Sequence, residues 1–407
     1  MRPLRLVLTP GLAPAVWWLQ AGVLLNFFGN GLVAPFLVIY LHYARGVPIA
    51  MAGLAIGSGG VVATASGILA GPIVDRFGAR NAVAVAMASN AIAYASYTQV
   101  HATWQAFLVS AAVGVGTGAY GPSVQTLLSS LVHADKRAAA FSQQRMSATV
   151  GLGLGAIVGG LIAAGGRPEN YELLLVLDAG TFLGYAVLLL SLPNPTTKRE
   201  RASGGYGEAL HDHRLVLLAF ASLVMVSAGI APMLVILPAF AKGHAHVPAP
   251  AIGLIYAVNT VVILLAQLQI TQAVAHRNPM RALAFGSGLW VIAWLLVLGA
   301  SLLTSGWTAA GVIALAMIFY ATGECVYTAI VTPTAAAIAP NALRGRYLAV
   351  LGFAWQAGFM VGPAGGGLLI DHMPLAFPAA AGVICALAAL LLPRAARLLP
   401  SDVRVGK

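Results

Sequence analysis

The stretch GILAGPIVDRFGAR, residues 67 to 80, places an aspartate and two arginines between two long apolar runs. Charged residues make up only 8% of the 407-residue chain and hydrophobic residues 59%, whereas an ordinary soluble domain carries about 25% charged and roughly 45–50% apolar residues. A helix that crosses a bilayer needs about 20 mainly apolar residues. The composition therefore predicts a membrane protein with about a dozen spans, in which the few charges are informative.

Apolar runs separated by charged or Pro/Gly-rich segments predict an all-α membrane protein with twelve spanning helices. The first run is too long for the apolar core of a cleavable signal peptide, so we expect it to be retained. The expected spans lie near residues 15–41, 49–73, 81–99, 104–131, 140–164, 172–192, 214–241, 250–274, 282–303, 307–337, 347–370 and 376–393.

The positive charges are distributed unevenly around these spans. With both termini in the cytoplasm, every Lys and Arg except Arg45, Arg167 and Lys242 falls on the cytoplasmic side. Lys and Arg gather in cytoplasmic loops of membrane proteins. The pattern predicts cytoplasmic termini in the plasma (inner) membrane, and it accounts for the net charge of +11 without a nucleic-acid partner.

The chain divides into two similar halves. The polar segment 193–213 reads as a cytoplasmic linker between six-helix bundles at 1–192 and 214–407. An offset of 207 positions places Arg137 on Arg344, and it also aligns a set of glycines described below. Parallel repeats of this kind are associated with transporters that bind substrate between their halves and work by alternating access.

The opening stretch carries the pattern G-x-x-x-D-R-x-G-x-R in the expected loop between the second and third spans, formed by Gly71, Asp75, Arg76, Gly78 and Arg80. The pattern resembles the loop signature of the major facilitator superfamily, although Asn81 stands at the usual final basic position. The resemblance implies two pseudo-symmetric bundles of six helices. It also implies that Asp75 latches the second helix to the eleventh on the cytoplasmic side. A loop that only fixes topology is the alternative, but it would not need the aspartate or the glycines.

A second motif lies in the eleventh span and, as a copy with Ala156 in place of proline, in the fifth. Small residues at four-residue spacing let helix backbones approach closely. The resemblance associates this pattern in the fifth helix with exporters, while tight packing alone stays open as an alternative. The motif residues are Gly151, Gly155, Gly159, Gly160, Gly358, Gly362, Pro363, Gly366 and Gly367.

Three charged residues, Arg145, Asp178 and Glu324, stand inside predicted spans, where a charge is costly and marks a functional candidate. Glu324 is expected in the middle of the tenth span and is our main candidate for proton coupling, with a permanently paired structural acid as the alternative. Asp178, near the start of the sixth span, also fits a hydrogen-bonded structural acid. Arg145 could neutralise an acid or extend to the cytoplasm.

Polar and aromatic side chains within the spans are candidates to line a substrate cavity, with hydrogen bonding between helices as the alternative for each. Such a cavity suits amphipathic or cationic organic molecules better than sugars. The candidates are Asn26, Asn30, Tyr120, Gln125, Asn259, Gln267, Tyr320, Tyr327, Trp355 and Gln356.

The sequence has no nucleotide-binding loop, metal-spaced histidine cluster or hydrolytic constellation in a plausible loop. We therefore expect no enzymatic activity and no cofactor or metal site. We expect transport that is driven by a proton gradient. We expect a monomer that exports drug-like compounds, with the lipid bilayer and a small-molecule substrate as its partners. Proton-coupled uptake or export of a specific metabolite is the alternative, and a non-transporting receptor or scaffold is a more distant one.

Overall fold

The computed structural model describes residues 13–133, 136–193, 210–275, 277–340 and 343–395. Its contacts divide the chain into two compact units, one made of 1–46 with 58–200 and the other of 47–57 with 201–407. Helix α4 thus contributes its first turns to the second unit and the rest to the first. Most of the predicted linker 193–213 lies outside the described residues.

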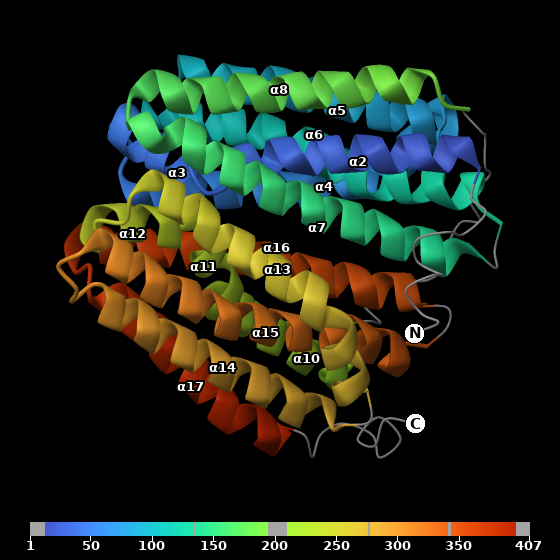
Figure 1. Ribbon diagram of the computed structural model, residues 1–407. Coiled ribbons are helices and arrows are strands. Elements are labelled where there is room, and N and C mark those ends of the chain that lie inside the picture. The colour runs from blue at the N-terminus through green and yellow to red at the C-terminus, as the bar shows by residue number, and fades with distance from the viewer. Residues whose placement is uncertain (1–12, 134–135, 194–209, 276, 341–342, 396–407) are drawn as a thin grey trace. The chain divides into compact units, whose positions relative to one another are not determined.

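The first unit is built from long helices and short connecting turns (Figure 1). Helix α2 packs against α7 and α8, and α5 packs against α6 and α8. The elements are α2 (Pro14–Val33), α3 (Leu37–Ile39), the π-helical turn η1 (Tyr40–Ala44), α4 (Ile49–Phe77), α5 (Ala79–Ser96), the 3₁₀ turn η2 (Tyr97–Gln99), α6 (Thr103–Leu131), α7 (Arg137–Ile162), the 3₁₀ turn η4 (Ala163–Gly165) and α8 (Pro168–Leu190).

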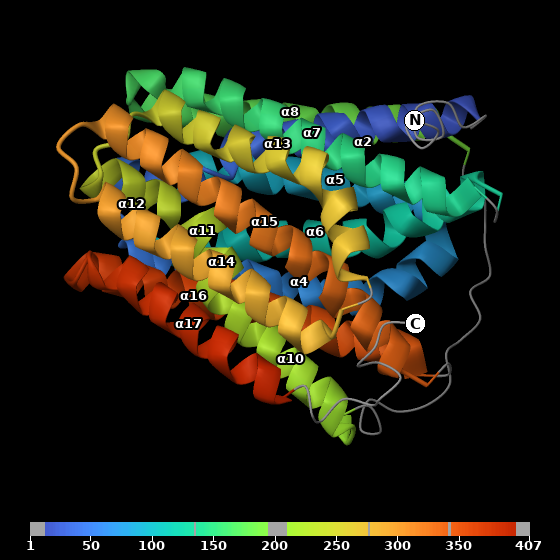
Figure 2. The same ribbon diagram turned by 60° about the horizontal axis from the view of Figure 1, so that its bottom comes forward.

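The second unit repeats this plan. Helix α15 packs between α13 and α14, and α14 also packs against α17, as both ribbon views show (Figures 1 and 2). The elements are α10 (His213–Met225), the π-helical turn η5 (Val226–Ile230), α11 (Ala231–Val235), α12 (Leu237–His244), α13 (Ala249–Val274), α14 (Pro279–Ala300), α15 (Gly306–Ile338), α16 (Arg344–His372) and α17 (Ala376–Ala395).

Eleven helical segments among the described residues are long and apolar enough to cross a membrane. Helix α5, with 18 residues, completes the twelve spans, and its polar residues Arg80, Asn81 and Asn90 lower its hydropathy. The repeat is also visible in the helix boundaries, because α7 begins at Arg137 and α16 begins at the aligned Arg344. The described residues therefore form an all-α membrane protein with twelve spanning segments in two similar sets.

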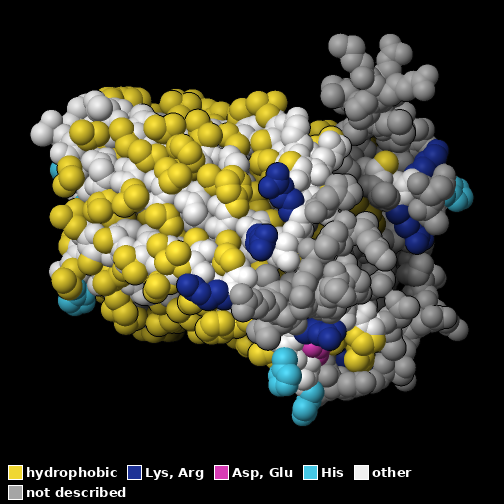
Figure 3. All heavy atoms as spheres, turned by 90° about the horizontal axis from the view of Figure 1, so that it is seen from below, with side chains coloured by type: hydrophobic (Ala, Val, Ile, Leu, Met, Phe, Trp, Pro, Cys, Tyr) yellow, Lys and Arg dark blue, Asp and Glu magenta, His cyan; other side chains and the backbone are white. Residues whose placement is uncertain are grey.

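The outer surface is apolar, as lipid contact requires. Large hydrophobic side chains such as Ile92, Val187 and Leu265 are more than half exposed. In Figure 3 the left part of the face is largely hydrophobic, and the Lys and Arg side chains lie from the middle of the view to its right side. Lipid tails do not penalise exposed apolar side chains as water does, so these residues need no protein partner.

Each unit has a tightly packed interior. In the first, Leu19, Met87, Leu127 and Tyr185 belong to one buried cluster. In the second, Trp290 and Trp294 on α14 are fully buried. Their indole nitrogens donate to the carbonyl oxygens of Tyr320 (3.0 Å) and Ala228 (2.9 Å). These bonds satisfy the polar ends of two large side chains inside the apolar core.

Several helix ends lie three or four residues from the predicted span ends, as three examples show. The second span continues to Phe77 rather than residue 73, so most of the motif that we expected in a loop is helical. The sixth helix begins at Pro168, a residue suited to the first helical position, and not at 172. The ninth begins at Pro279 instead of 282, because the side chain of Asn278 caps its first turn.

The first and seventh spans, which we predicted as continuous runs, are interrupted. The first passes through residues 34–36 into the π-helical turn η1, and the seventh contains η5 and a break at Ile236 before α12. Pro232 and Pro238 stand at the second positions of α11 and α12, and each lacks the N–H that would bond to the preceding turn.

Candidate substrate and coupling site

The side chain of Glu324 lies near the middle of α15, a helix of 33 residues, and is half-buried. On the neighbouring helix α13, Asn259 is 9% exposed. The Nδ2 of Asn259 donates a hydrogen bond to Oε2 of Glu324 over 3.4 Å. The fold thus brings two of the predicted site residues together, although they stand 65 positions apart in the sequence.

Gln267 lies about two turns beyond Asn259 on α13 and is also bound to α15. Its Nε2 donates to the carbonyl oxygen of Cys325 over 3.3 Å. Its Oε1 accepts from the hydroxyl of Thr328 over 3.3 Å. Glu324, Asn259 and Gln267 therefore belong to one polar contact between two spanning helices.

The aromatic candidates of the second unit divide into packed and accessible residues. Tyr320 is fully buried, with its ring 6.3 Å from that of Trp290. Tyr327 is 3% exposed and shares a hydrogen bond with the hydroxyl of Ser222. Trp355 on α16 is half-buried, and its ring centroid lies 5.6 Å from that of Tyr327. Of these three aromatic candidates, Trp355 presents the most surface.

Gln356, beside Trp355 on α16, is half-buried as well. The remaining cavity candidates lie in the first unit. Asn26 on α2 is buried, and the Nδ2 of Asn30 donates to its backbone oxygen over 3.1 Å. The half-buried Tyr120 on α6 packs edge-on against Tyr185, and Gln125 is exposed.

Asp178 is fully buried near the middle of α8, deeper in its helix than the sequence suggested. The hydroxyl of Thr181 donates to its Oδ1 over 3.2 Å. A β-carbon on Gly29 would collide with the same oxygen, so the carboxyl fills the space between α8 and α2. Arg145 on α7, in contrast to Asp178, is exposed.

The motif of residues 71–80 spans the end of α4 and the start of α5. Gly78 separates the two helices with a φ of 81°, a conformation that favours glycine. Arg80 donates to the carbonyl oxygen of Leu192 over 2.9 Å, next to the end of α8. Arg76 is exposed. The side chain of Asp75 and the surroundings of Gly71 lie outside the described residues.

The two glycine motifs make equivalent contacts in the two units. On α7, a β-carbon at Gly155 would collide with the carbonyl oxygen of Phe28 on α2. On α16, a β-carbon at Gly362 would collide with the carbonyl oxygen of Ser227 in η5. Gly155 thus faces α2, the first helix of its half, and Gly362 faces the first span of the other half. The other close approaches are Gly151 to Leu24, Gly159 to Leu32, Gly358 to Val226, Gly366 to Phe377 and Gly367 to Ala50.

Comparison with known families identifies this architecture. The sequence model of the Major Facilitator Superfamily matches residues 20–322. The chain belongs to the Major Facilitator Superfamily. The superfamily match covers most of the chain, and it agrees with twelve spanning helices in two similar sets.

Relatives within the superfamily are distant in sequence but similar in length. An uncharacterized transporter of the superfamily, YqjV from Bacillus subtilis (strain 168), is 22% identical over 88% of this chain and 87% of its own length. The multidrug resistance protein MdtH from Cronobacter sakazakii is 27% identical over 86% of this chain and 84% of its own.

Solved structures share the superfamily fold. The nucleoside transporter NupG has a TM-score of 0.76 and 15% identity, covering 95% of this chain and 99% of its own. A D-xylose–proton symporter has a TM-score of 0.72 and 16% identity, covering 93% and 96%. At these identities the likeness extends to the fold alone.

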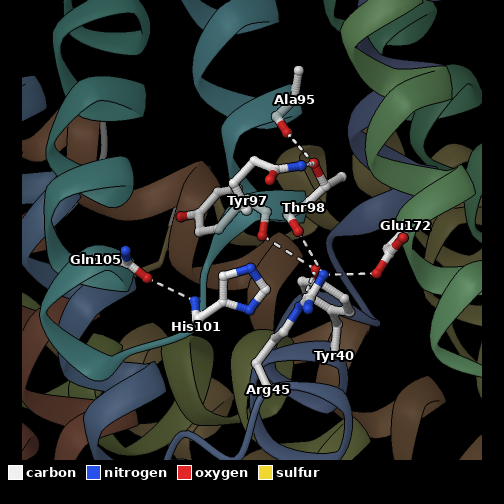
Figure 4. A network of polar contacts seen from close by, with 9 residues as sticks. Tyr40, Arg45, Ala95, Tyr97, Thr98, His101, Gln105 and Glu172 are labelled. Atoms are coloured by element: carbon white, nitrogen blue, oxygen red, sulfur yellow. Dashed lines mark hydrogen bonds and ion pairs between the residues drawn. The ribbon is translucent and has the colours of Figure 1, made fainter.

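The chain also contains a polar network that we did not anticipate from the sequence (Figure 4). Arg45, which follows η1, forms an ion pair of 2.7 Å with Glu172 on α8. It also donates to the hydroxyl of Tyr40 over 2.6 Å and to the carbonyl oxygen of Thr98. The network joins the connection after η1, the turn η2 and helix α8. A signal in the sequence was the position of Arg45, one of three basic residues outside the predicted cytoplasmic segments.

Proposed function

We propose that this transporter exports small amphipathic or cationic organic compounds in exchange for protons. Glu324 carries the proposal. A carboxyl group in the middle of a spanning helix costs free energy and is seldom present without a role. Its half-buried side chain can be reached, and the amide of Asn259 can bind its charged form. The carboxyl can therefore take up a proton in one step of the cycle and release it in another.

The substrate class is supported by the side chains near this carboxyl. Tyr327 follows Glu324 by one helical turn and contacts Trp355, whose ring lies 5.4 Å from that of Phe359. Trp355 and Phe359 are half-buried, so each ring presents part of its surface. Aromatic faces attract organic cations, and a carboxylate adds to this attraction. The similarity to proteins named for multidrug resistance agrees with the proposal.

The transport cycle that we propose is alternating access, driven by a proton gradient. The halves 1–192 and 214–407 would move against each other, joined by the linker 193–213. In this cycle Asp75 would latch the cytoplasmic side. The arginine-rich segments would lie in the cytoplasm, and both termini would then lie on the cytoplasmic side of the plasma membrane.

The experiment measures proton movement caused by tetraphenylphosphonium, a lipophilic cation, in inverted membrane vesicles with a pH-sensitive dye. We expect the parent protein to couple transport of the cation to proton movement, and Glu324→Gln to lose this coupling. Glu169→Gln, which alters an exposed glutamate in the first turn of α8, serves as the control. Unchanged coupling in Glu324→Gln would remove this residue from the mechanism.

The direction of transport is tested in whole cells. An exporter lowers the cellular content of the cation when the cells are energised, and removal of the gradient restores it. Energy-dependent accumulation would instead favour proton-coupled uptake. Lack of binding or transport of lipophilic cations, together with transport of one metabolite, would favour a metabolite transporter with the same fold.

A further inference from the structure

A continuous set of polar side chains extends from Glu324 toward one end of helix α13. Thr328 lies one turn beyond Glu324 on α15, and its hydroxyl lies within hydrogen-bond distance of Oε1 of Gln267 (3.3 Å). The Nε2 of Gln267 donates to the hydroxyl of Thr271 over 3.2 Å. Thr271 is close to Val274, the last residue of α13. The side chains of these four residues are half-buried.

In the opposite direction from Glu324, several side chains are buried. On α15 the residues Met317 and Tyr320 are fully buried. On α13 the side chain of Ile255 is 3% exposed. The hydroxyl of Tyr256 donates to the carbonyl oxygen of Met233 over 2.8 Å, so it is held by the end of α11. The side chains that are linked to one another by hydrogen bonds, Thr328, Gln267 and Thr271, thus extend toward the end of α13.

Half-exposed amide and hydroxyl groups within a membrane span require either protein partners or water. Lipid tails offer neither. Gln267 and Thr328 bind each other and the carbonyl oxygen of Cys325, but each also presents surface. Such surface can hold water molecules, which need two or more polar partners to occupy a site of this kind.

We infer that a water-filled path lined by Thr328, Gln267 and Thr271 carries the proton that Glu324 releases. In this step the O–H bond of the Glu324 carboxyl breaks, and a water molecule takes the proton to become hydronium. The carboxylate remains and can accept the hydrogen bond from Asn259. The threonine and glutamine side chains hold the water in place and need not carry the proton themselves.

The path leads to the cytoplasmic side under the proposed orientation. Two arginines lie near the end of α13. Arg277 follows α13, and Arg281 lies in the first turn of α14. Asn259 and Thr271 are separated by about 18 Å along the helix axis. The titratable groups near Glu324 on the same two helices are Tyr256, Tyr320, Cys325 and Tyr327. The inference rests on the proposed role of Glu324 as the proton carrier.

The test uses the full chain in proteoliposomes with tetraphenylphosphonium and a pH-sensitive dye. Thr328→Val and Gln267→Leu keep much of the side-chain volume but remove the groups that bind water. We expect each to slow proton release by about tenfold or more, and we expect Thr328→Val to leave the affinity for the cation unchanged. Thr328→Ser restores the hydroxyl and should restore the rate. The matched control is Thr322→Val, since the Thr322 hydroxyl binds the carbonyl oxygen of Ile318 on its own helix.

The outcomes separate this inference from the proposed function. If Glu324→Gln abolishes coupling but the Thr328→Val/Gln267→Leu double variant releases protons at the parent rate, the path is wrong and the proposed function stands. If Glu324→Gln retains coupling, the proposed function itself fails. A cooperative thermal unfolding transition in detergent, measured for each variant, shows that it is folded. Should Gln267→Leu not fold, the comparison of Thr328→Val with Thr328→Ser decides.

Discussion

Arg45 and Glu172 stand 127 positions apart in the sequence and form an ion pair of 2.7 Å at one end of the first unit. The guanidinium group also binds Tyr40 and Thr98, so it connects the end of the first span to η2 and α8. Because Tyr40 is almost completely buried, the guanidinium stabilises a polar group that water cannot reach.

Removal of this network should destabilise the first unit. We expect Glu172→Gln to lower the free energy of unfolding by about 1 kcal/mol, since the pair is partly exposed. Arg45→Gln should cost about 2 kcal/mol, because it also leaves a buried hydroxyl without its donor. Thermal unfolding of the purified protein in detergent measures both. Arg167→Gln, at an exposed arginine beside α8, should have little effect. Equal melting temperatures for Arg45→Gln and Arg167→Gln would contradict a stabilising role.

The sequence was sufficient for the spans because hydropathy reports directly which segments can enter a bilayer. It also placed the repeat correctly, as the helices that begin at Arg137 and Arg344 show. It did not predict the π-helical turns at Tyr40–Ala44 and Val226–Ile230. A backbone carbonyl accepts from the N–H four residues ahead in an α-helix and five ahead in a π-helix. The hydropathy of the sequence is the same in both cases, so it contains no signal for these turns.

Contacts between distant residues were harder to anticipate. Asn259 and Glu324 were separate candidates, and their hydrogen bond depends on how α13 and α15 pack. The Arg45–Glu172 pair was missed for the same reason. We predicted a loop at the end of α4 because charged residues are typical of the connections between spans. In the structure the turn consists of Gly78 alone. Charge patterns indicate the side of the membrane and do not indicate where a helix ends.

Asp178 and Glu324 should behave differently, although both acids lie within spanning helices. Asp178 is fully buried, bound to Thr181, and packed against Gly29. We expect Asp178→Asn to retain proton coupling, because the amide keeps the shape and the bond to Thr181. Asp178→Leu should lower stability by about 1–3 kcal/mol through crowding against α2. Proton movement in vesicles and thermal unfolding measure the two effects. Loss of coupling in Asp178→Asn would instead make this residue part of the coupling mechanism.

The glycine motif of α16 offers a matched pair of substitutions. Gly362→Ala places a methyl group against the carbonyl oxygen of Ser227, so we expect it to destabilise the second unit by about 1–3 kcal/mol. Gly365→Ala, on the same helix, meets nothing within 4 Å. It should leave the melting temperature unchanged or raise it, since alanine favours helix more than glycine does. Similar melting temperatures for the two variants would argue against close packing at Gly362.

His244, the last residue of α12, should make stability depend on pH. Burial and the charge of the neighbouring His246 lower the pKa of His244 from its ordinary value of 6.5. The ring of His244 stacks on Phe240, with 5.4 Å between their centroids. A histidine with a lowered pKa is held neutral in the folded protein, so the unfolded chain binds more protons in mildly acidic solution. Stability therefore falls as pH decreases from 6.5 toward the pKa of the folded state.

Substitution of His244 tests this pH dependence. We expect His244→Gln to reduce the loss of stability below pH 6.5. His246→Gln removes one of the two causes of the lowered pKa of His244. The stability of this variant should therefore depend on pH less than that of the parent and more than that of His244→Gln. Melting temperatures measured at pH values from about 5 to about 8, where histidine titrates, give the comparison. An identical loss of stability with acid in the parent and His244→Gln would mean that other groups account for it.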